Sequence, residues 1–296
     1  MRVLIVGCGY VGLNVGAELA RQGHQVFGVR RTADTASVLK AAAIELARAD
    51  ITKLDELRAL PGPFDWVVNT ASSSKGGAEE YREVYLRGTR NLLEWLAATP
   101  PRKYVYTSST SVYAQTDGSL VKETSPAEPD TEVGKVLLET EQALLEAART
   151  AKFPAVILRV AGIYGPERGH LFTQYLRGEA RIPGLGDRWI NMIHRDDVAG
   201  AIVAALQSGR PGEIYNVADD EPVHYVNFFR WLSETLGLRM PPMIPEPAVH
   251  VSKRAITNKR ICNRKLTMEL GVRLKYSSFR QGYTAEIKRL EEIGVL

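Results

Sequence analysis

Short apolar runs alternate with longer amphipathic segments through the first half of the chain. The strand-like runs lie at Val3–Val6, Gln25–Val29, Asp65–Asn69, Lys103–Thr107 and Ala155–Val160. Segments with helical periodicity separate them, among them Tyr10–Arg21, Glu79–Ala98 and Glu132–Ala151. Apolar strands that alternate with helices predict right-handed βαβ units and a parallel sheet that is covered on both faces. We therefore expect an α/β fold with a doubly wound parallel sheet.

This rhythm breaks after about Gly165, where glycine and proline become more frequent and the alternation becomes irregular. Pro241–Pro247 is too rich in proline for a helix or a central strand, and it predicts a surface connection. Ile214–Val217 predicts a last strand that returns to the main sheet, and Ser278–Leu290 predicts a closing amphipathic helix. The second half is therefore expected to be organised differently from the first.

The length of 296 residues suits one large domain with an appendage. We expect a sheet domain over residues 1–165 and a smaller C-terminal substrate domain over residues 166–296. Residues 190–217 are expected to return partly to the sheet domain. The chain has no apolar run of about 18 residues or more, and its first apolar run is too short for a signal peptide. These features predict a cytoplasmic protein without a membrane partner.

The net charge of +4 comes from basic residues that are dispersed along the chain. The short clusters Arg30-Arg31 and Lys253-Arg254 are too small for a nucleic-acid surface, so we expect no nucleic-acid partner. A mild positive charge suits an anionic small ligand. Two distant cysteines and five histidines without ligand spacing predict neither a disulfide framework nor a metal site. Cys8 could be either a small turn residue or a redox-sensitive thiol.

A glycine-rich turn follows the first expected strand and opens the first helix. Its sequence is Gly7-Cys8-Gly9-Tyr10-Val11-Gly12. In a βαβ unit the first glycine permits a tight turn, the second lets the backbone approach a pyrophosphate, and the third allows close helix packing. The free N–H groups at the helix start then face the phosphates. The turn predicts a dinucleotide-binding Rossmann domain with Gly7, Gly9, Tyr10, Val11 and Gly12 at the cofactor, although such a turn can be purely structural.

The end of the second expected strand bears on the choice of cofactor. An acidic residue there would accept hydrogen bonds from the ribose hydroxyls of NAD, whereas this chain has Arg30 and Arg31. Guanidinium groups favour a 2′-phosphate and offer no acceptor to a free hydroxyl. We therefore expect NADP(H) rather than NAD(H). The alternative is a pair of solvated surface arginines.

Three further stretches carry a family resemblance. Ala49-Asp50-Ile51 follows the third strand, Val67–Ser72 ends the fourth, and Thr107–Tyr113 ends the fifth. Together with the glycine turn they resemble the extended short-chain dehydrogenase/reductases, the NAD-dependent epimerase/dehydratase family. The resemblance runs from Arg2 to about Ile287. It includes later landmarks at Leu158-Arg159, Tyr164-Gly165-Pro166, His194–Val198 and Ile214–Val217.

The resemblance implies roles for single residues. Further cofactor-binding positions correspond to Asp50, Ile51, Thr70, Ala71, Ser72 and Lys135. Ser109 takes the place of the catalytic hydroxyl. The implied activity is hydride transfer on a hydroxylated metabolite or a sugar nucleotide. We expect a small-molecule substrate and a monomer or homodimer.

The departures from the family pattern are equally informative. The glycine turn is one residue short, Tyr85 stands where the family has Asn, and Gly162 replaces an Asn on the substrate side. Thr131 stands where the catalytic Tyr of a Tyr-x-x-x-Lys motif should precede Lys135. The pattern is most similar to the atypical YeeZ-like branch, which lacks that tyrosine.

The missing tyrosine leaves three interpretations of the chemistry. In the family mechanism the lysine lowers the pKa of the phenol from about 10, which lets it exchange a proton. A threonine hydroxyl is far less acidic. The chain could be an enzyme with a substitute acid/base at Tyr113, at Tyr164 or in a bound water. It could instead be a non-catalytic NADP(H)-binding sensor, or an enzyme adapted to other chemistry.

His194 lies beside Asp196 and Asp197, which could suggest a metal site or an acid/base pair. We expect Asp196 or Asp197 to cap the helix that follows, and His194 to be structural.

Overall fold

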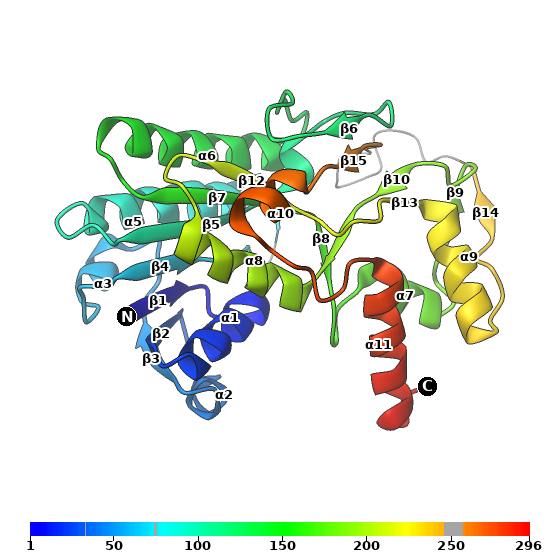
Figure 1. Cartoon of the computed structure of the whole chain (residues 1–296), viewed down its shortest axis with the longest axis horizontal. Coiled ribbons are helices and arrows are strands. Elements are labelled where there is room, and N and C mark those ends of the chain that lie inside the picture. Colours follow the sequence, from blue (N-terminus) through cyan, green and yellow to red (C-terminus); the bar gives the residue numbers. More distant parts are fainter. Residues whose placement is uncertain (33, 74–75, 246–256) are drawn as a thin grey trace.

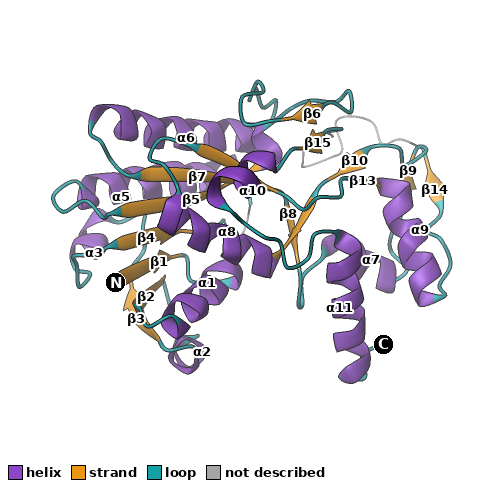
Figure 2. Ribbon diagram, in the orientation of Figure 1, coloured by secondary structure: helices purple, strands orange, loops and turns teal. Residues whose placement is uncertain are grey.

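The computed structural model describes residues 1–32, 34–73, 76–245 and 257–296. Its centre is a seven-stranded sheet with the order β12-β7-β5-β4-β1-β2-β3, in which all neighbouring strands are parallel. The strands are β1 (Arg2–Val6), β2 (Gln25–Arg30), β3 (Ile44–Arg48), β4 (Trp66–Asn69), β5 (Lys103–Ser109), β7 (Ala155–Val160) and β12 (Ile214–Val217). The expected doubly wound parallel sheet is confirmed, and Figures 1 and 2 show it with helices on both faces.

The apolar strands follow from burial on both faces. Val3 and Ile5 belong to one hydrophobic cluster, whereas Leu4 and Val6 belong to the other. The first face is covered by α1 (Tyr10–Arg21), α2 (Ala36–Ala41), α8 (Arg195–Ser208) and α10 (Arg264–Leu270). The second face is covered by α3 (Leu54–Arg58), α5 (Gly88–Leu96) and α6 (Glu132–Thr150). A strand between two helical layers has no solvent side, so polar residues do not alternate along it.

The segment expected as one helix over Glu79–Ala98 is interrupted. It consists of α4 (Ala78–Tyr81), a π-helical turn η1 (Arg82–Arg87) and α5. The π turn ends at Gly88, where a Cβ atom would lie 2.6 Å from Cδ1 of Ile51. The segment therefore packs closely against the loop after β3.

The C-terminal part has its own hydrophobic cluster, which is rich in aromatic residues. Its helices are α7 (His170–Leu176), α9 (Tyr225–Leu236) and α11 (Phe279–Glu292), which lie together on the right of Figure 1. Four two-stranded pairings join the remaining short strands. These strands are β6 (Leu120–Val121) with β15 (Arg260–Ile261), β8 (Gly162–Tyr164) with β11 (Met192–His194), β9 (Ile182–Pro183) with β14 (Met243–Ile244), and β10 (Trp189–Ile190) with β13 (Val223–His224).

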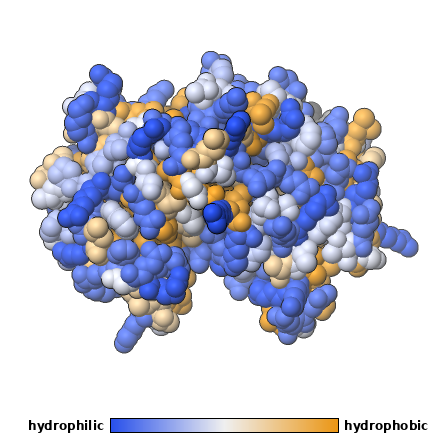
Figure 3. All heavy atoms as spheres, viewed as in Figure 1, coloured by the Kyte–Doolittle hydropathy of each residue, from blue (hydrophilic) through white to orange (hydrophobic). Residues whose placement is uncertain are grey.

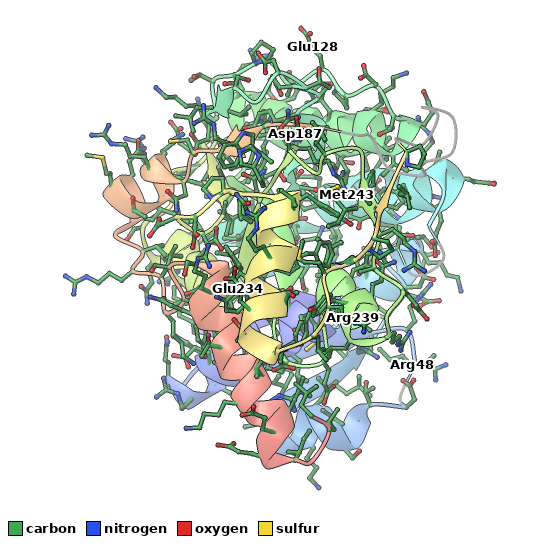
Figure 4. The ribbon with its side chains drawn as sticks, turned by 90° about the vertical axis from the view of Figure 1, so that its right-hand side faces the viewer. Arg48, Glu128, Asp187, Glu234, Arg239 and Met243 are labelled. Atoms are coloured by element: carbon green, nitrogen blue, oxygen red, sulfur yellow. The ribbon has the colours of Figure 1, made fainter. Side chains whose placement is uncertain are left out.

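Several expectations for the second half meet the structure directly. Ile214–Val217 forms β12 and pairs with β7 in the main sheet, as expected. The closing helix α11 begins after Ser278, whose side chain accepts a hydrogen bond from the Gln281 N–H. Within the proline-rich stretch, Met243 lies on the short strand β14 outside the central sheet, and its side chain is exposed (Figure 4). Pro247 lies outside the described residues.

The strand order reverses between β1 and β4. In doubly wound sheets, ligands bind at the carboxyl ends of the strands beside such a reversal. Figure 3 shows that polar side chains cover most of the face in view. None of the helices in the described ranges is long and apolar enough to span a membrane.

Candidate functional site

The glycine turn connects β1 to α1 beside the end of β4. Gly7 has a φ of +78°, and a Cβ atom there would lie 2.5 Å from Cα of Ala71. A Cβ at Gly12 would lie 2.7 Å from the Gly7 carbonyl oxygen and 2.8 Å from Oγ1 of Thr70. Both glycines are therefore required by the packing of the turn itself.

Gly9 differs from its two neighbours in the motif. A Cβ there would have Nη1 of Arg30 at 3.6 Å and the Gly7 oxygen at 3.9 Å, which are ordinary contacts. Its φ of −104° is negative, and its ψ of −140° lies outside the common helix and strand regions. The packing around Gly9 therefore leaves room for a side chain, but a ligand lying against the backbone would need that room. No side chain caps the start of α1, so its N–H groups and positive dipole end remain available to phosphates. A dinucleotide fits this cradle.

A pocket of about 340 Å³ opens beside the turn. It is lined by Gly7, Gly9, Val29, Arg30, Arg31, Thr32, Ala49, Asp50, Ile51, Ala71, Ser72 and Val84. The structure thus brings together most of the residues that the sequence assigned to the cofactor. The sequence analysis missed Val29, Thr32 and Ala49, which are chain neighbours of assigned residues. It also missed Val84, for which no motif gave a signal.

The electrostatic character of the pocket comes from arginines at the ends of β2 and β3. Nη1 of Arg30 donates to the Cys8 carbonyl at 3.1 Å, which holds its guanidinium over the turn. Nε of Arg48, at the margin of the molecule in Figure 4, donates to the Arg31 carbonyl at 3.3 Å. The carboxylate of Asp50 accepts hydrogen bonds from Thr52 N at 2.9 Å and from Thr52 Oγ1 at 2.8 Å. The pocket therefore presents positive charge beside a carboxylate that already has partners.

Other residues assigned to the cofactor lie outside the lining of this pocket. The Tyr10 hydroxyl donates to the Pro166 carbonyl at 3.0 Å, so its side chain reaches toward the C-terminal part. The Thr70 hydroxyl donates to the Gly7 carbonyl at 3.0 Å and thereby holds the turn. Val11 and Gly12 lie in the first turn of α1. These residues support the glycine turn and the start of α1 without lining the pocket.

Cys8 is 2% exposed and packs beneath Gly28 of β2, where a Cβ would lie 2.8 Å from its Sγ. Burial raises the pKa of the thiol to about 12. A buried thiol that stays protonated is unreactive. The redox-sensing alternative for Cys8 is therefore wrong, and the residue is a small packing group.

The assigned catalytic residues lie where β5 meets the start of α6. The side chain of Ser109 accepts a hydrogen bond from Ser111 N at 3.1 Å and caps the 3-10 turn η2 (Thr110–Val112). A Cβ at Gly134 would lie 3.4 Å from the Ser111 oxygen, so the start of α6 packs against this turn. The structure therefore places the Ser109 turn next to the helix that carries Lys135.

Thr131 and Lys135 do not form the expected pair on one helical face. Thr131 is the N-cap of α6, and its Oγ1 accepts a hydrogen bond from Gly134 N at 3.1 Å. Nζ of Lys135 lies 2.7 Å from a carboxylate oxygen of Glu132, and both side chains are exposed. The hydrogen bond that Lys135 donates to Glu132 raises the pKa of the lysine. The hydroxyl and the ammonium are therefore engaged in local helix structure.

Neither tyrosine that could substitute for the missing phenol reaches the crevice. The Tyr113 hydroxyl donates to Oδ1 of Asn216 at 2.9 Å and accepts from Nη1 of Arg159 at 2.8 Å, inside the core. Tyr164 is 1% exposed and stacks on Tyr283 with ring centroids 4.4 Å apart. Burial raises the pKa of both phenols. Of the three substitutes considered, the geometry therefore favours neither Tyr113 nor Tyr164.

A buried ion pair lies behind the Ser109 turn. Nη2 of Arg159 lies 2.6 Å from Oε2 of Glu141, and the two side chains are 4% and 0% exposed. The Ser108 hydroxyl donates to the same carboxylate at 2.5 Å. This network joins β5, α6 and β7 and fixes the direction of the strand end. The sequence marked Arg159 only as a family landmark, since its partner is 18 residues away.

The cluster around His194 is structural, but its cap was assigned to the wrong residue. Nδ1 of His194 accepts a hydrogen bond from Asp196 N at 3.1 Å, so His194 itself is the N-cap of α8. Asp197 instead accepts hydrogen bonds from the backbone of Lys275 and Tyr276. Burial lowers the pKa of His194 to about 4. Within the described parts of the chain, no group of His, Cys, Asp and Glu side chains could hold a metal ion.

The two remaining departures from the family pattern are also placed. Tyr85 lies in η1 with its ring centroid 4.7 Å from that of Tyr81. Gly162, the first residue of β8, is exposed, and its N–H donates to the Asn191 carbonyl at 3.1 Å.

Comparisons with known proteins agree with this geometry. The model of the NAD-dependent epimerase/dehydratase family matches residues 3–218. Protein YeeZ of Escherichia coli is 32% identical over 283 residues, which are 93% of this chain and 96% of that protein. A solved putative NAD-dependent epimerase/dehydratase from Methylobacillus flagellatus is 30% identical, with a TM-score of 0.77 and 98% of each chain covered. UDP-glucuronic acid 4-epimerase of Bacillus cereus, solved with UDP-glucuronic acid and NAD, is 22% identical with a TM-score of 0.83, covering 99% of this chain and 100% of that one.

Proposed function

Because the chain belongs to the NAD-dependent epimerase/dehydratase family, we propose that it binds NADP(H) in the pocket beside the glycine turn. We propose further that it transfers hydride to or from a hydroxylated small molecule such as a sugar nucleotide. The observation that carries the cofactor choice is the position of Arg30. Its guanidinium lies over the turn, 3.6 Å from the Cβ position of Gly9, at the strand end where NAD sites carry an acidic residue.

The surrounding groups support a 2′-phosphate. Arg30 and Arg31 both line the pocket and supply charge-assisted donors. Among the described lining residues Asp50 is the sole carboxylate. It follows β3 rather than β2, whose end carries Arg30, and both hydrogen bonds from Thr52 go to its Oδ1. A free 2′-hydroxyl would therefore face donors, whereas a phosphate would find partners.

The chemistry needs a proton acceptor as well as a hydride acceptor. When an alcohol is oxidised, its carbon gives a hydride to the nicotinamide and its hydroxyl gives a proton to a base. Ser109 can hold the substrate oxygen, because its hydroxyl proton is not used when its oxygen accepts from Ser111 N. The phenols of Tyr113 and Tyr164 are buried, and the Thr131 hydroxyl is a helix cap. A bound water is then the proton acceptor in this proposal.

The second candidate is a non-catalytic NADP(H)-binding sensor. The observation that favours it is that Thr131, which stands in place of the family's catalytic tyrosine, uses its hydroxyl oxygen to cap α6. A sensor predicts no turnover of carbonyl or sugar-nucleotide panels. It predicts instead a conformational or oligomeric difference between the NADPH-bound and NADP⁺-bound protein, measurable by scattering.

Titration calorimetry tests the cofactor proposal. The wild-type protein should bind NADPH more tightly than NADH, because only NADPH carries the 2′-phosphate. Arg30→Asp should weaken NADPH binding about ten- to a hundred-fold and reverse or abolish the preference. Arg149→Asp on the exposed face of α6 makes the same change in net charge and should have no such effect. Equal affinity of the wild type for both cofactors would contradict the proposal.

A further inference from the structure

Lys259 is a buried lysine that lies against the Ser109 turn. It directly precedes β15 and is 4% exposed. Its Nζ donates to the carbonyl oxygen of Tyr113 at 2.7 Å. Tyr113 is the C-cap of η2, the turn that opens at Ser109. The ammonium therefore lies at the carboxyl end of β5, one turn beyond the hydroxyl that we place at the substrate.

A second contact ties Lys259 to the neighbouring strand end. Nδ2 of Asn191 donates to the Lys259 carbonyl at 2.9 Å, and its Oδ1 accepts from Ile261 N at 2.7 Å. The Asn191 carbonyl in turn accepts from the N–H of Gly162, which begins β8 two residues after the end of β7. Lys259 is thus held between the carboxyl ends of β5 and β7, along the edge where doubly wound sheets bind their ligands.

The charge of Lys259 has no partner of opposite sign among the described residues. No carboxylate there forms an ion pair with it, and the single hydrogen bond to Tyr113 leaves two of its three N–H donors unassigned. Burial lowers the pKa of the ammonium to about 8. The other buried cation of this core, Arg159, is paired with Glu141. A buried charge without compensation is costly, and ligands often supply the missing charge.

We propose that Lys259 is the anion-recognition residue of the substrate pocket and pairs with a carboxylate or phosphate group of the bound substrate. This inference rests on the proposed function, which places a hydroxylated substrate at this edge. It narrows the substrate class to anionic metabolites, such as a sugar acid or a sugar nucleotide. A neutral sugar or alcohol would leave the ammonium uncompensated.

Lys103 provides a matched control, because it lies at the amino end of β5, whereas Lys259 lies near the carboxyl end of that strand. Lys103 is the first residue of β5, its Nζ donates to the backbone carbonyl of Gly209, and burial lowers its pKa as well. The amino end of the strand is the edge away from the crevice. Lys103→Met and Lys259→Met therefore remove the same kind of contact, but only the second removes a charge from the proposed pocket.

The test measures binding of four probes to the NADPH-saturated protein by calorimetry. The probes are UDP-glucuronate, UDP-glucose, UDP and inorganic phosphate. Lys259→Met should weaken the binding of an anionic probe by about tenfold or more, whereas Lys103→Met should not. Loss confined to UDP-glucuronate assigns Lys259 to a carboxylate, and equal loss for all three nucleotides assigns it to a phosphate. Unchanged affinities in Lys259→Met would overturn the proposal.

A second measurement keeps the test independent of folding of the variant and of the cofactor proposal. In wild-type protein labelled at the lysine side chains, the resonance of Lys259 is followed by NMR with and without each probe. An anion at the ammonium should raise its pKa, because the charged form is stabilised. An unmoved Lys259 pKa with every probe would overturn the inference. NADPH affinity is measured on the same samples, so a failure of the cofactor proposal is seen separately.

Discussion

The two halves of the carboxyl edge of the sheet are built in opposite ways. At the ends of β1, β2 and β3 the structure leaves groups open to a pocket, because a Cβ at Gly9 would make only ordinary contacts and the start of α1 has no side-chain cap. At the end of β5 and the start of α6 the assigned catalytic groups are all engaged. Ser109 caps a turn, Thr131 caps a helix, and Lys135 pairs with Glu132.

The two sides of the edge differ in which polar groups are free to bond to a ligand. The N–H groups at the start of α1 and the arginines of the pocket can bond to an anionic ligand, so this side of the edge is organised for binding. At the end of β5 and the start of α6, the polar groups already stabilise local structure. Acid–base catalysis needs a group whose pKa lies near neutrality, whereas the hydrogen bond to Glu132 raises the pKa of Lys135. Binding is thus better prepared than proton transfer.

The variant Gly9→Val gives the largest expected effect and tests whether the glycine turn binds the cofactor. The added side chain would occupy the space over the turn, where the backbone must approach the pyrophosphate. We expect NADPH affinity to fall by at least about 100-fold, while the circular dichroism spectrum and the melting temperature stay close to those of the wild type. Unchanged affinity in the folded variant would show that the turn is only a turn.

Gly12→Ala is the matched control for this variant. Its Cβ would lie 2.7 Å from the Gly7 oxygen and 2.9 Å from Cγ2 of Ile5, so the turn itself must shift. This variant should lose folding stability as well as cofactor binding. Comparing the two variants therefore separates the role of Gly9 in ligand binding from the role of Gly12 in folding.

Tyr113→Phe tests the claim that the second half is committed to structure. Removing the phenol oxygen leaves Nη1 of Arg159 and Oδ1 of Asn216 without this partner in the core. Such a loss costs about 1–3 kcal/mol of folding free energy, measurable by urea denaturation. NADPH affinity and any turnover per folded molecule should be unchanged. A loss of turnover at full stability would instead make Tyr113 the acid/base.

The fold was predictable because its signals are local. Apolar strands, amphipathic helices and the glycine turn each lie within a short window, and α1 and β12 begin and end at the predicted residues. The pocket lining was predictable in the same way, since most of its residues follow strand ends. The helix predicted over Glu79–Ala98 is present from Ala78 to Leu96, but its π-helical stretch η1 carries no comparable signal.

The contacts of Tyr113 were not predictable, because its partners are distant in the sequence. Tyr113 bonds to Asn216, 103 residues away, and to Lys259, 146 residues away. The role of Thr131 did have a local signal, since threonine is a favoured N-cap residue before a helix. The family alignment directed attention to its place in the Tyr-x-x-x-Lys motif instead.

Thr131 gives the smallest and most discriminating prediction. Thr131→Ala removes the hydroxyl that accepts from Gly134 N, and it should lower the free energy of unfolding by about 1 kcal/mol with NADPH affinity unchanged. Thr131→Asn restores a good N-cap without a hydroxyl, so it should recover wild-type stability in the same urea titration. If Thr131 moved the proton, both variants would lose turnover by about 10²–10⁴-fold, because neither retains the hydroxyl. If it only caps α6, turnover in both variants should stay within a few-fold of the wild type. A stable Asn variant that has lost turnover would show that the Thr131 hydroxyl takes part in catalysis. The contrast between this side of the edge and the glycine turn would then no longer hold.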